Sequence, residues 1–242
     1  MAEKIKVIVN GKEVYAAYDT PLLQVCREAG ADVPTLCHNE NINPPYGVCR
    51  VCTVEITEGT RTRFAPSCVY PVRREISVQT ESEPVRRRRA MLLNFLLARC
   101  PDQKPIQELA ARYGVKEPHP RFTRRGDDCI LCGLCVQTCT QVVGVSALGF
   151  ESRGEMREAA TPYRAENPVC IACGACAYIC PTQCIGFEEK DGKRYLKRWK
   201  REAPMLVCEK CGSYWLPEAV ARIVGEKMNI DFSGLNVCPN CR

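Results

Sequence analysis

The sequence is poor in histidine and lacks long apolar runs and nucleotide-binding motifs. Only 2 of its 242 residues are histidine, and neither belongs to a catalytic pattern. The most apolar stretch, residues 91–98, is too short to span a bilayer, so we expect no membrane span. No basic-then-apolar segment follows Met1, which predicts a cytoplasmic protein without a signal peptide. Because no Gly-rich fingerprint is present, we expect the chain to bind neither flavin nor NAD.

Charge of one sign is only mildly in excess. The formal net charge is +6, and its densest run is the four arginines at 86–89. Such a run fits nucleic acid, an acidic partner or a solvated helix face. No helix-turn-helix, RNA-binding or interleaved aromatic pattern accompanies it. We therefore favour the solvated helix and expect no nucleic-acid partner.

The first third of the chain predicts a mixed sheet with one helix across it. Alternating apolar and polar residues at 4–9 and 12–15 flank Asn10-Gly11, a hairpin turn signal. Thr20 is placed to cap a helix that Gly30 ends. Further strands are expected near 51–57, 62–69 and 75–78, and further helices at 84–98 and 105–114. The predicted fold class is α+β.

What the sequence has in excess is cysteine, with 19 residues. Residues 129–139 and 170–180 repeat one pattern, C-x2-C-x2-C-x3-C, and Pro181 follows the second copy. This is the bacterial ferredoxin run that holds two [4Fe–4S] clusters, in which the last cysteine of each run serves the other cluster. The predicted ligands of one cluster are Cys129, Cys132, Cys135 and Cys180, and those of the other are Cys170, Cys173, Cys176 and Cys139.

An earlier group of cysteines reads C-x11-C-x2-C-x15-C, with a longer first gap than the plant-type [2Fe–2S] ferredoxin has. Pro44, Pro45 and Gly47 can bend this loop so that amide N–H groups point at the sulfurs. Zinc would satisfy the same four thiolates, but the position ahead of two ferredoxin runs favours iron–sulfur chemistry. The predicted [2Fe–2S] ligands are Cys37, Cys49, Cys52 and Cys68.

Two C-x2-C pairs follow near the end of the sequence. They predict a tetrahedral four-sulfur site, suited to zinc or to a single iron. We favour structural zinc, with a single iron or a further iron–sulfur cluster as alternatives. The predicted metal ligands are Cys208, Cys211, Cys238 and Cys241.

Three cysteines remain outside these sets. Cys26 falls on the first predicted helix and is expected to be a small buried apolar residue. Cys184 follows the second ferredoxin run and is interpreted as a packing residue rather than a cluster ligand. Cys100 stands alone after the second long helix, and one thiolate cannot hold a cubane.

The order of these motifs over residues 1–190 resembles a known architecture. "PTLCHNENINPPYGVCRVCTVEI", "IQELAARYGV" and "CILCGLCVQTCTQVVGVSALGF" are similar to the N-terminal part of the complex I iron–sulfur G subunit. The same parts recur in the small diaphorase subunit of NAD-reducing [NiFe] hydrogenases, in NAD-linked formate dehydrogenases and in the A subunit of bifurcating hydrogenases. The resemblance does not include the hydrogen-activating domain of iron-only hydrogenases.

The resemblance implies a domain order. It implies a β-grasp [2Fe–2S] domain at 1–80, a helical middle domain at 81–122 and a two-[4Fe–4S] ferredoxin domain at 123–200. The two C-x2-C pairs add a metal-binding tail at 201–242. The family's middle domain usually carries a cubane held by one histidine and three cysteines. Here Leu96 takes the histidine position and Lys104-Pro105 replaces later thiolates, so we expect that cluster to be absent.

The resemblance also implies a function and partners. It implies an electron-transfer subunit without a substrate-converting centre of its own. Its implied partners are a flavin and NAD(H)-binding subunit, a thioredoxin-like [2Fe–2S] subunit, and a catalytic subunit such as the [NiFe] hydrogenase small subunit or formate dehydrogenase. Two alternatives are an iron–sulfur subunit of a succinate dehydrogenase or fumarate reductase type, and a zinc-binding interaction protein. The first normally has the shorter [2Fe–2S] gap, and the second leaves the ferredoxin repeat unexplained.

Overall fold

The computed structural model describes residues 4–122, 125–229 and 235–242. The chain divides into two compact units, residues 1–132 and 133–242, and each is described by itself. The predicted domain boundary at 122–123 touches residues 123–124, which lie outside the described part. No helix in the described residues is both long and apolar enough to cross a membrane.

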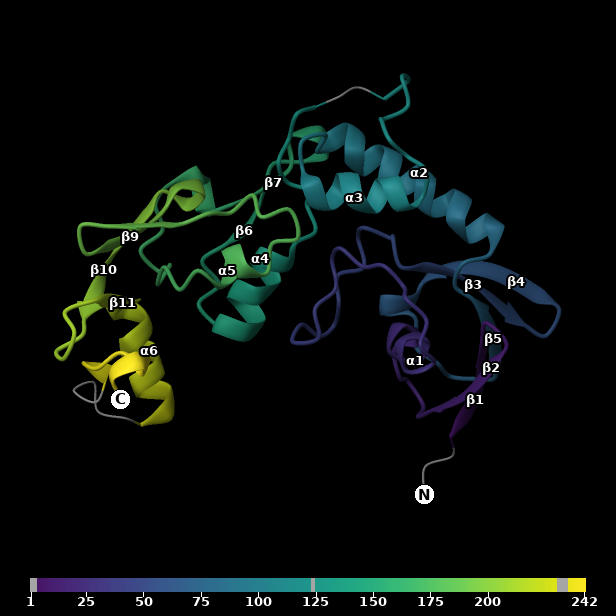
Figure 1. Ribbon diagram of the computed structural model, residues 1–242, viewed down its shortest axis with the longest axis horizontal. Helices are drawn as coiled ribbons and strands as arrows, with labels where there is room; N and C mark the ends of the chain where they lie inside the picture. Colours follow the sequence, from purple (N-terminus) through teal and green to yellow (C-terminus); the bar gives the residue numbers. More distant parts are fainter. Residues whose placement is uncertain (1–3, 123–124, 230–234) are drawn as a thin grey trace. The chain divides into compact units, whose positions relative to one another are not determined.

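A five-stranded mixed sheet, ordered β2-β1-β5-β3-β4, organises the first unit (Figure 1). The hairpin expected around Asn10-Gly11 is confirmed, and β1 also pairs in parallel with β5. Strands β3 and β4 form a second hairpin that joins the sheet through β5. The strands are β1 (Ile5–Val9), β2 (Lys12–Ala16), β3 (Thr53–Glu58), β4 (Arg61–Pro66) and β5 (Ile76–Gln79).

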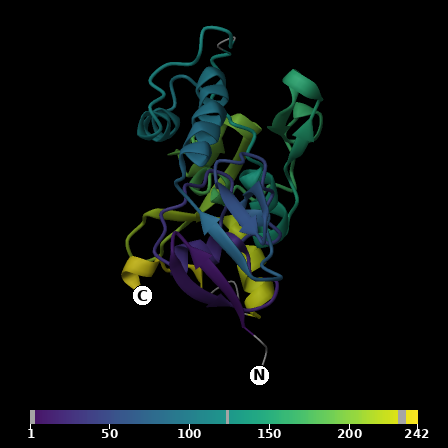
Figure 2. The ribbon, with the colours of Figure 1, turned by 90° about the vertical axis from the view of Figure 1, so that its right-hand side faces the viewer.

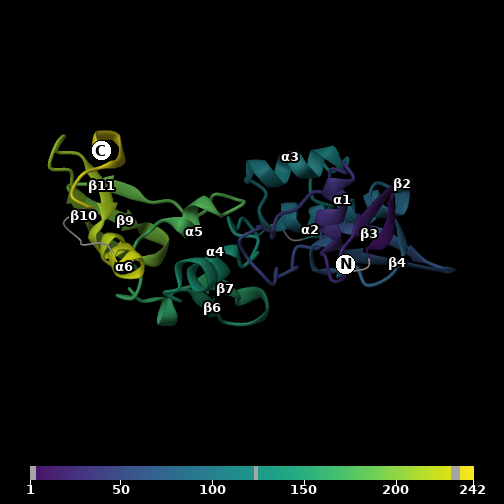
Figure 3. The ribbon, with the colours of Figure 1, turned by 90° about the horizontal axis from the view of Figure 1, so that it is seen from below.

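Helix α1 (Leu22–Glu28) covers the sheet (Figure 3). Its buried side chains, including Leu22 and Val25, join the sheet residues in one apolar core. Cys26 is fully buried in this core, which confirms its predicted apolar role. The predicted Thr20 cap is wrong, because Pro21 takes the N-cap position and no side chain caps the helix. Thr20 instead bonds Val72 through its backbone carbonyl.

Two helices complete the first unit, α2 (Glu83–Arg99) and α3 (Lys104–Arg112) (Figure 2). The arginine run lies on α2, but its prediction as a solvated face is wrong for Arg89, which is fully buried. The Arg89 guanidinium donates to the Thr53 carbonyl at 2.9 Å and to the Tyr113 hydroxyl at 2.8 Å, and it pairs with Glu81. A buried charge needs such partners, and these join α2 to the strand that follows Cys52.

The second unit begins at Gly133, inside the first cysteine run, and contains the whole of the second run. Each run forms a short helical turn in its second half, and a two-stranded sheet lies between the two runs along the chain. The elements are α4 (Leu134–Gln137), the π-helical turn η2 (Thr138–Val143), β6 (Gly149–Glu151), β7 (Glu158–Ala160) and α5 (Ala175–Tyr178).

A four-stranded antiparallel sheet, ordered β11-β10-β9-β8, continues this unit into the tail. The first half of β10 pairs with β9, whereas Met205–Val207 pair with β11. One strand therefore pairs both with the hairpin that follows the second cysteine run and with the tail. The remaining elements are β8 (Glu188–Lys190), β9 (Lys193–Leu196), β10 (Arg201–Val207), β11 (Tyr214–Pro217) and α6 (Glu218–Met228).

Candidate metal centres

The first four-cysteine set lies in the loop between α1 and β3 and on the turn after β4. Cys37 and Cys49 lie in the long loop after α1, and Cys52 ends that loop one residue before β3. Cys68 lies on a 3-10 turn, Ser67–Val69, directly after β4. Cys37, Cys52 and Cys68 are buried, and Cys49 is half-buried. The sulfurs thus border the apolar core, which includes Cys52 and Cys68.

These sulfurs contact one another in two pairs. The Cys37 thiol donates to Cys49 Sγ at 3.2 Å. This bond, helped by the backbone N–H groups of Val51 and Leu36, lowers the pKa of Cys49 to about 6. A hydrogen bond from the Cys68 thiol likewise lowers the pKa of Cys52 to about 7. The arrangement fits a two-iron cluster with two thiolates on each iron and amide N–H groups directed at sulfur.

The backbone of this loop is shaped by Gly47. Its φ of +66° lies in the left-handed region, and a Cβ there would come within 2.7 Å of Val69 Cγ1. Val69 follows Cys68, so the absence of a side chain at Gly47 lets the loop approach the turn that carries the fourth cysteine.

A second set lines one cavity of the second unit. The residues around this cavity are apolar apart from four thiols, and include Leu148, Leu196 and Trp199. Gly174, at φ +80°, also borders it, and a Cβ there would press on Phe187 at 3.1 Å. The four thiols belong to Cys139, Cys170, Cys173 and Cys176, the set predicted for one cubane.

N–H donors and the buried Arg194 guanidinium bond to the segments that line this cavity. The Ala147 backbone N–H donates to Cys139 Sγ at 3.2 Å, and Trp199 Nε1–H donates to Cys176 Sγ at 3.3 Å. The buried Arg194 guanidinium donates to the carbonyls of Ala172 and Cys173. Such N–H···S bonds and a dry, fixed surround are what an iron–sulfur site requires.

The other predicted cubane set is divided between the two units. Cys129 and Cys132 belong to the first unit, and Cys135 and Cys180 belong to the second. This set therefore stays a prediction from the spacing. Cys180 Sγ lies 3.6 Å from Cys184 Sγ, so Cys184 packs directly against a predicted ligand.

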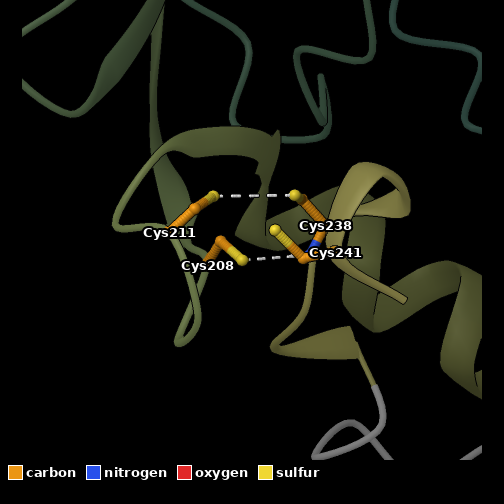
Figure 4. Close-up of side chains that lie close together, drawn as sticks. All are labelled: Cys208, Cys211, Cys238 and Cys241. Carbon is orange, nitrogen blue, oxygen red and sulfur yellow. Dashed lines mark hydrogen bonds between the residues drawn. The ribbon is translucent and has the colours of Figure 1, made fainter.

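The tail brings its four cysteines together most closely (Figure 4). The sulfurs of Cys208, Cys211, Cys238 and Cys241 all lie within 4.8 Å of one another. Four sulfurs bound tetrahedrally at 2.3 Å from one ion lie about 3.8 Å apart, and Cys211 Sγ and Cys238 Sγ are separated by 3.8 Å. The donor set and its spacing fit a single tetrahedral ion.

Backbone turns at the two C-x2-C pairs direct N–H groups at these sulfurs, which favours the thiolate form that binds a metal. The Cys238 backbone N–H donates to Cys208 Sγ at 3.3 Å, and with the N–H groups of Cys211 and Lys210 it lowers the pKa of Cys208 to about 6. Gly212, at φ +72°, turns the chain so that its N–H reaches the Cys208 carbonyl at 2.8 Å. The two knuckles are also joined directly, by Lys210 Nζ to the Cys241 carbonyl at 2.9 Å.

Sequence reasoning missed the groups that brace the cavity. Trp199, Arg194 and Arg201 all follow the second cysteine run, where no motif singles them out. Arg201 Nε donates to the Cys170 carbonyl at 2.8 Å. The only signal was composition, since Trp199 is one of two tryptophans and lies in a basic segment interpreted as strand-like.

Comparison with known proteins supports the interpretation of the N-terminal site. The family model for the "2Fe-2S iron-sulfur cluster binding domain" matches residues 2–83. The G 2 subunit of the NADH-quinone oxidoreductase of Rhizobium meliloti is 29% identical over an alignment that covers 86% of this chain and 27% of that protein. "NADPH-Fe(3+) oxidoreductase subunit alpha" of Geobacter sulfurreducens is 31% identical, over 74% of this chain and 23% of that protein.

One solved structure is also similar. A chain in the crystal structure of the NAD+-reducing [NiFe]-hydrogenase in the H2-reduced state aligns with a TM-score of 0.54 and 27% identity. The alignment covers 65% of this chain and 74% of that one. This chain spans about a quarter of the length of the two curated relatives described above. The resemblance predicted from the cysteine motifs is confirmed: the chain is a homologue of the iron–sulfur subunits of complex I and of NAD(P)-linked hydrogenases and oxidoreductases.

Proposed function

We propose that this protein is an iron–sulfur electron-transfer subunit of a cytoplasmic, NAD(P)H-linked multi-subunit oxidoreductase. Iron–sulfur clusters, when bound, supply one-electron exchange. The chain contributes the thiolates, the N–H donors that stabilise negative sulfur, and an apolar surround that excludes water.

The observation that carries this proposal is the cavity lined by Cys139, Cys170, Cys173 and Cys176. Cys139 comes from the first ferredoxin run and the other three come from the second. This exchange of the last cysteine is the arrangement found in two-cluster ferredoxins. By the same rule we assign the second cubane to Cys129, Cys132, Cys135 and Cys180, and the [2Fe–2S] cluster to Cys37, Cys49, Cys52 and Cys68.

The relatives suggest where the electrons come from and go. The names of the similar proteins include NADH-quinone, NADPH-Fe(3+) and NAD+-reducing hydrogenase functions. We propose a flavin and NAD(H)-binding subunit as one partner, with a thioredoxin-like [2Fe–2S] subunit beside it. The other partner is a catalytic subunit of the hydrogenase or formate dehydrogenase type.

For the tail we propose a structural zinc ion rather than a further link in the electron path. Four thiolates in two knuckles form a closed site without an open position for a substrate. Zinc has no redox chemistry, so such a site stabilises the fold alone. Iron at this position would instead make the tail a redox centre.

Metal and sulfide analysis tests the proposal. Anaerobically purified protein should contain about ten irons and about ten sulfides per chain, from one [2Fe–2S] and two [4Fe–4S] clusters, and one zinc. About nine irons with a [3Fe–4S] spin-resonance signal would favour a succinate dehydrogenase type of subunit. Zinc without sulfide would favour the interaction protein and contradict the proposal.

Cys100 offers a sharper test of the cluster count. It is buried at the end of α2, and we propose that it binds no metal. The Cys100→Ser variant should keep the iron content and every reduced-state spin-resonance signal of the unchanged chain. Loss of one cubane signal would show that the middle domain holds a cluster. Purification of the native complex then identifies the catalytic partner.

A further inference from the structure

Trp199 is the largest fully buried side chain in the described part of the protein. It lies on a 3-10 turn, Lys197–Trp199, between β9 and β10. Its ring is 1% exposed and lines the cavity that holds Cys139, Cys170, Cys173 and Cys176. The residue comes after both ferredoxin runs and belongs to neither, so no cysteine motif assigns it a role.

The indole has one polar atom, and that atom is a donor only. A buried indole N–H needs an acceptor. In this protein the acceptor is Cys176 Sγ, 3.3 Å from Nε1. For comparison, Cys139 Sγ accepts from the backbone N–H of Ala147, which any residue at that position except proline would supply.

The segments on either side fix the ring in this position. Leu196, which is 1% exposed, ends β9 and lines the same cavity. Lys200 has a left-handed φ of +50° and its N–H bonds the Lys197 carbonyl, which turns the chain tightly around Trp199. Arg201 then anchors the start of β10 to the Cys170 carbonyl and to Glu166, both at 2.8 Å. The Arg201 bond thus ties the segment after the indole to the cysteine loop, and Leu196 lines the cavity on the other side.

We propose that Trp199 is a positioning residue that raises the reduction potential of the cluster held by Cys139, Cys170, Cys173 and Cys176. The inference rests on the proposed function. Reduction adds negative charge that is shared with the ligand sulfurs, and an N–H dipole aimed at Cys176 Sγ stabilises the reduced form more than the oxidised form. Hydrogen bonds to cluster sulfurs are one of the means by which proteins set these potentials.

The variant Trp199→Phe removes the donor and keeps an aromatic ring in the cavity. In the full-length chain, purified anaerobically with its clusters, a redox titration followed by electron paramagnetic resonance gives the potential of each cluster. At the midpoint potential of the unchanged protein, the ratio of reduced to oxidised cluster should fall about tenfold in the variant. A tenfold change in a one-electron equilibrium corresponds to about 59 mV.

The chain contains a matched control in its second tryptophan. Trp215 Nε1 is buried on β11 and has no hydrogen-bond partner among the described residues. Trp215→Phe therefore changes the same chemical group away from the cavity, and no cluster potential should move. An intact cluster with an unchanged potential in Trp199→Phe would overturn the proposal. So would an equal shift in both variants.

A measurement on the unsubstituted protein covers the case in which Trp199→Phe loses the cluster. With 15N-labelled tryptophan, electron–nuclear double resonance on the reduced protein should detect one indole nitrogen and its exchangeable proton coupled to a cubane. Absence of that coupling would overturn the proposal whatever the variant does. If the unchanged protein shows no [4Fe–4S] signal at all, the proposed function fails instead.

Discussion

The proposed [2Fe–2S] site and the tail site each consist of four cysteines, but in opposite structural settings. The first borders a core built from a five-stranded sheet and α1, and two of its cysteines belong to that core. The tail site lies beside one strand pair, β10 and β11, and the helix α6. Only Ala221 and Gly225 are buried among the described residues of α6. Cys211 is exposed. In the described residues, packing supports the first site more than the second, where Cys208 and Cys238 are buried but few apolar side chains of α6 are.

The difference indicates whether the fold supports the metal site or the metal supports the fold. A sheet with its own core can hold a cluster cradle in place, so the metal binds a folded protein. A short segment with almost no core depends on the metal for its fold, as zinc fingers do. Identical ligands therefore do not imply identical roles. Four substitutions, each with a control variant, test this contrast between the two sites.

The largest effect is expected from losing a tail ligand. Cys211→Ser removes one thiolate at an exposed position, and metal binding contributes roughly 10–16 kcal/mol of apparent free energy in zinc-finger peptides. We expect α6 to lose its amide protection in hydrogen exchange. In the matched variant Cys49→Ser, strands β1 to β5 should stay protected although the cluster is lost. Equal loss of protection in both variants would remove the distinction between the sites.

The next effect tests whether the first unit is stabilised by its own interactions. Arg89→Met leaves the Thr53 carbonyl without its buried donor, which typically costs about 1–3 kcal/mol, whereas Glu81 is partly exposed and keeps Arg86 as a partner. Denaturant unfolding of the first unit measures the loss. Arg87→Met is the control, because Arg87 is exposed and its pairing with Glu83 contributes about 0.3–0.5 kcal/mol. Similar losses in the two variants would contradict the role given to Arg89.

A smaller effect is expected at the loop that carries the [2Fe–2S] ligands. Gly47→Ala and Gly59→Ala both place a side chain at a left-handed φ, at a cost of about 1–2 kcal/mol each. Only the first adds a close contact, with Val69 Cγ1, whereas nothing lies within 4 Å at Gly59. Thermal unfolding should therefore show a larger loss for Gly47→Ala, and its visible spectrum should change. Equal melting temperatures and spectra would mean that the loop accommodates the added methyl group without a change at the cysteine site.

The smallest effect concerns one buried hydroxyl beside the same site. Ser67 Oγ donates to the Cys52 carbonyl at 2.9 Å, and its loss should cost about 1 kcal/mol. Ser67→Ala should lower the midpoint of denaturant unfolding slightly and keep the cluster. Thr62→Ala, which removes an exposed hydroxyl pair with Thr57, serves as the control with almost no effect. A loss of the whole cluster in Ser67→Ala would show that the cluster-binding loop depends on this hydrogen bond, contrary to our expectation.

Local patterns allowed much of the fold to be predicted. The hairpin at Asn10-Gly11, the helix after Pro21 and the two long helices follow from turn chemistry and apolar spacing. The spacing of the cysteines also indicated which of them lie together in the tail and around the cavity, because ligand spacing is a local property of the chain, whereas the assignment of each set to a cluster stays a prediction. The gathering of Cys139 with the second run followed from the ferredoxin pattern rather than from proximity in sequence.

What could not be predicted depends on contacts between distant segments. Arg89 and Arg87 have the same side chain and stand two residues apart, and only the helix orientation against β3 buries one and exposes the other. Trp199 stands 23 residues from the sulfur it contacts. No local pattern encodes either contact, because both arise from tertiary packing.

The position of Trp199 in the chain also bears on how the protein is made. A ribosome releases the N-terminal part first, so Cys139 and the run at 170–176 emerge before Leu196 and Trp199. Those two residues form part of the cavity wall, and β10 then links that wall to the tail. During synthesis the cysteines are therefore exposed before their cover exists. Delivery of the proposed cluster in this interval would need no opening of the finished protein, and most of the tail is synthesised after the cavity wall.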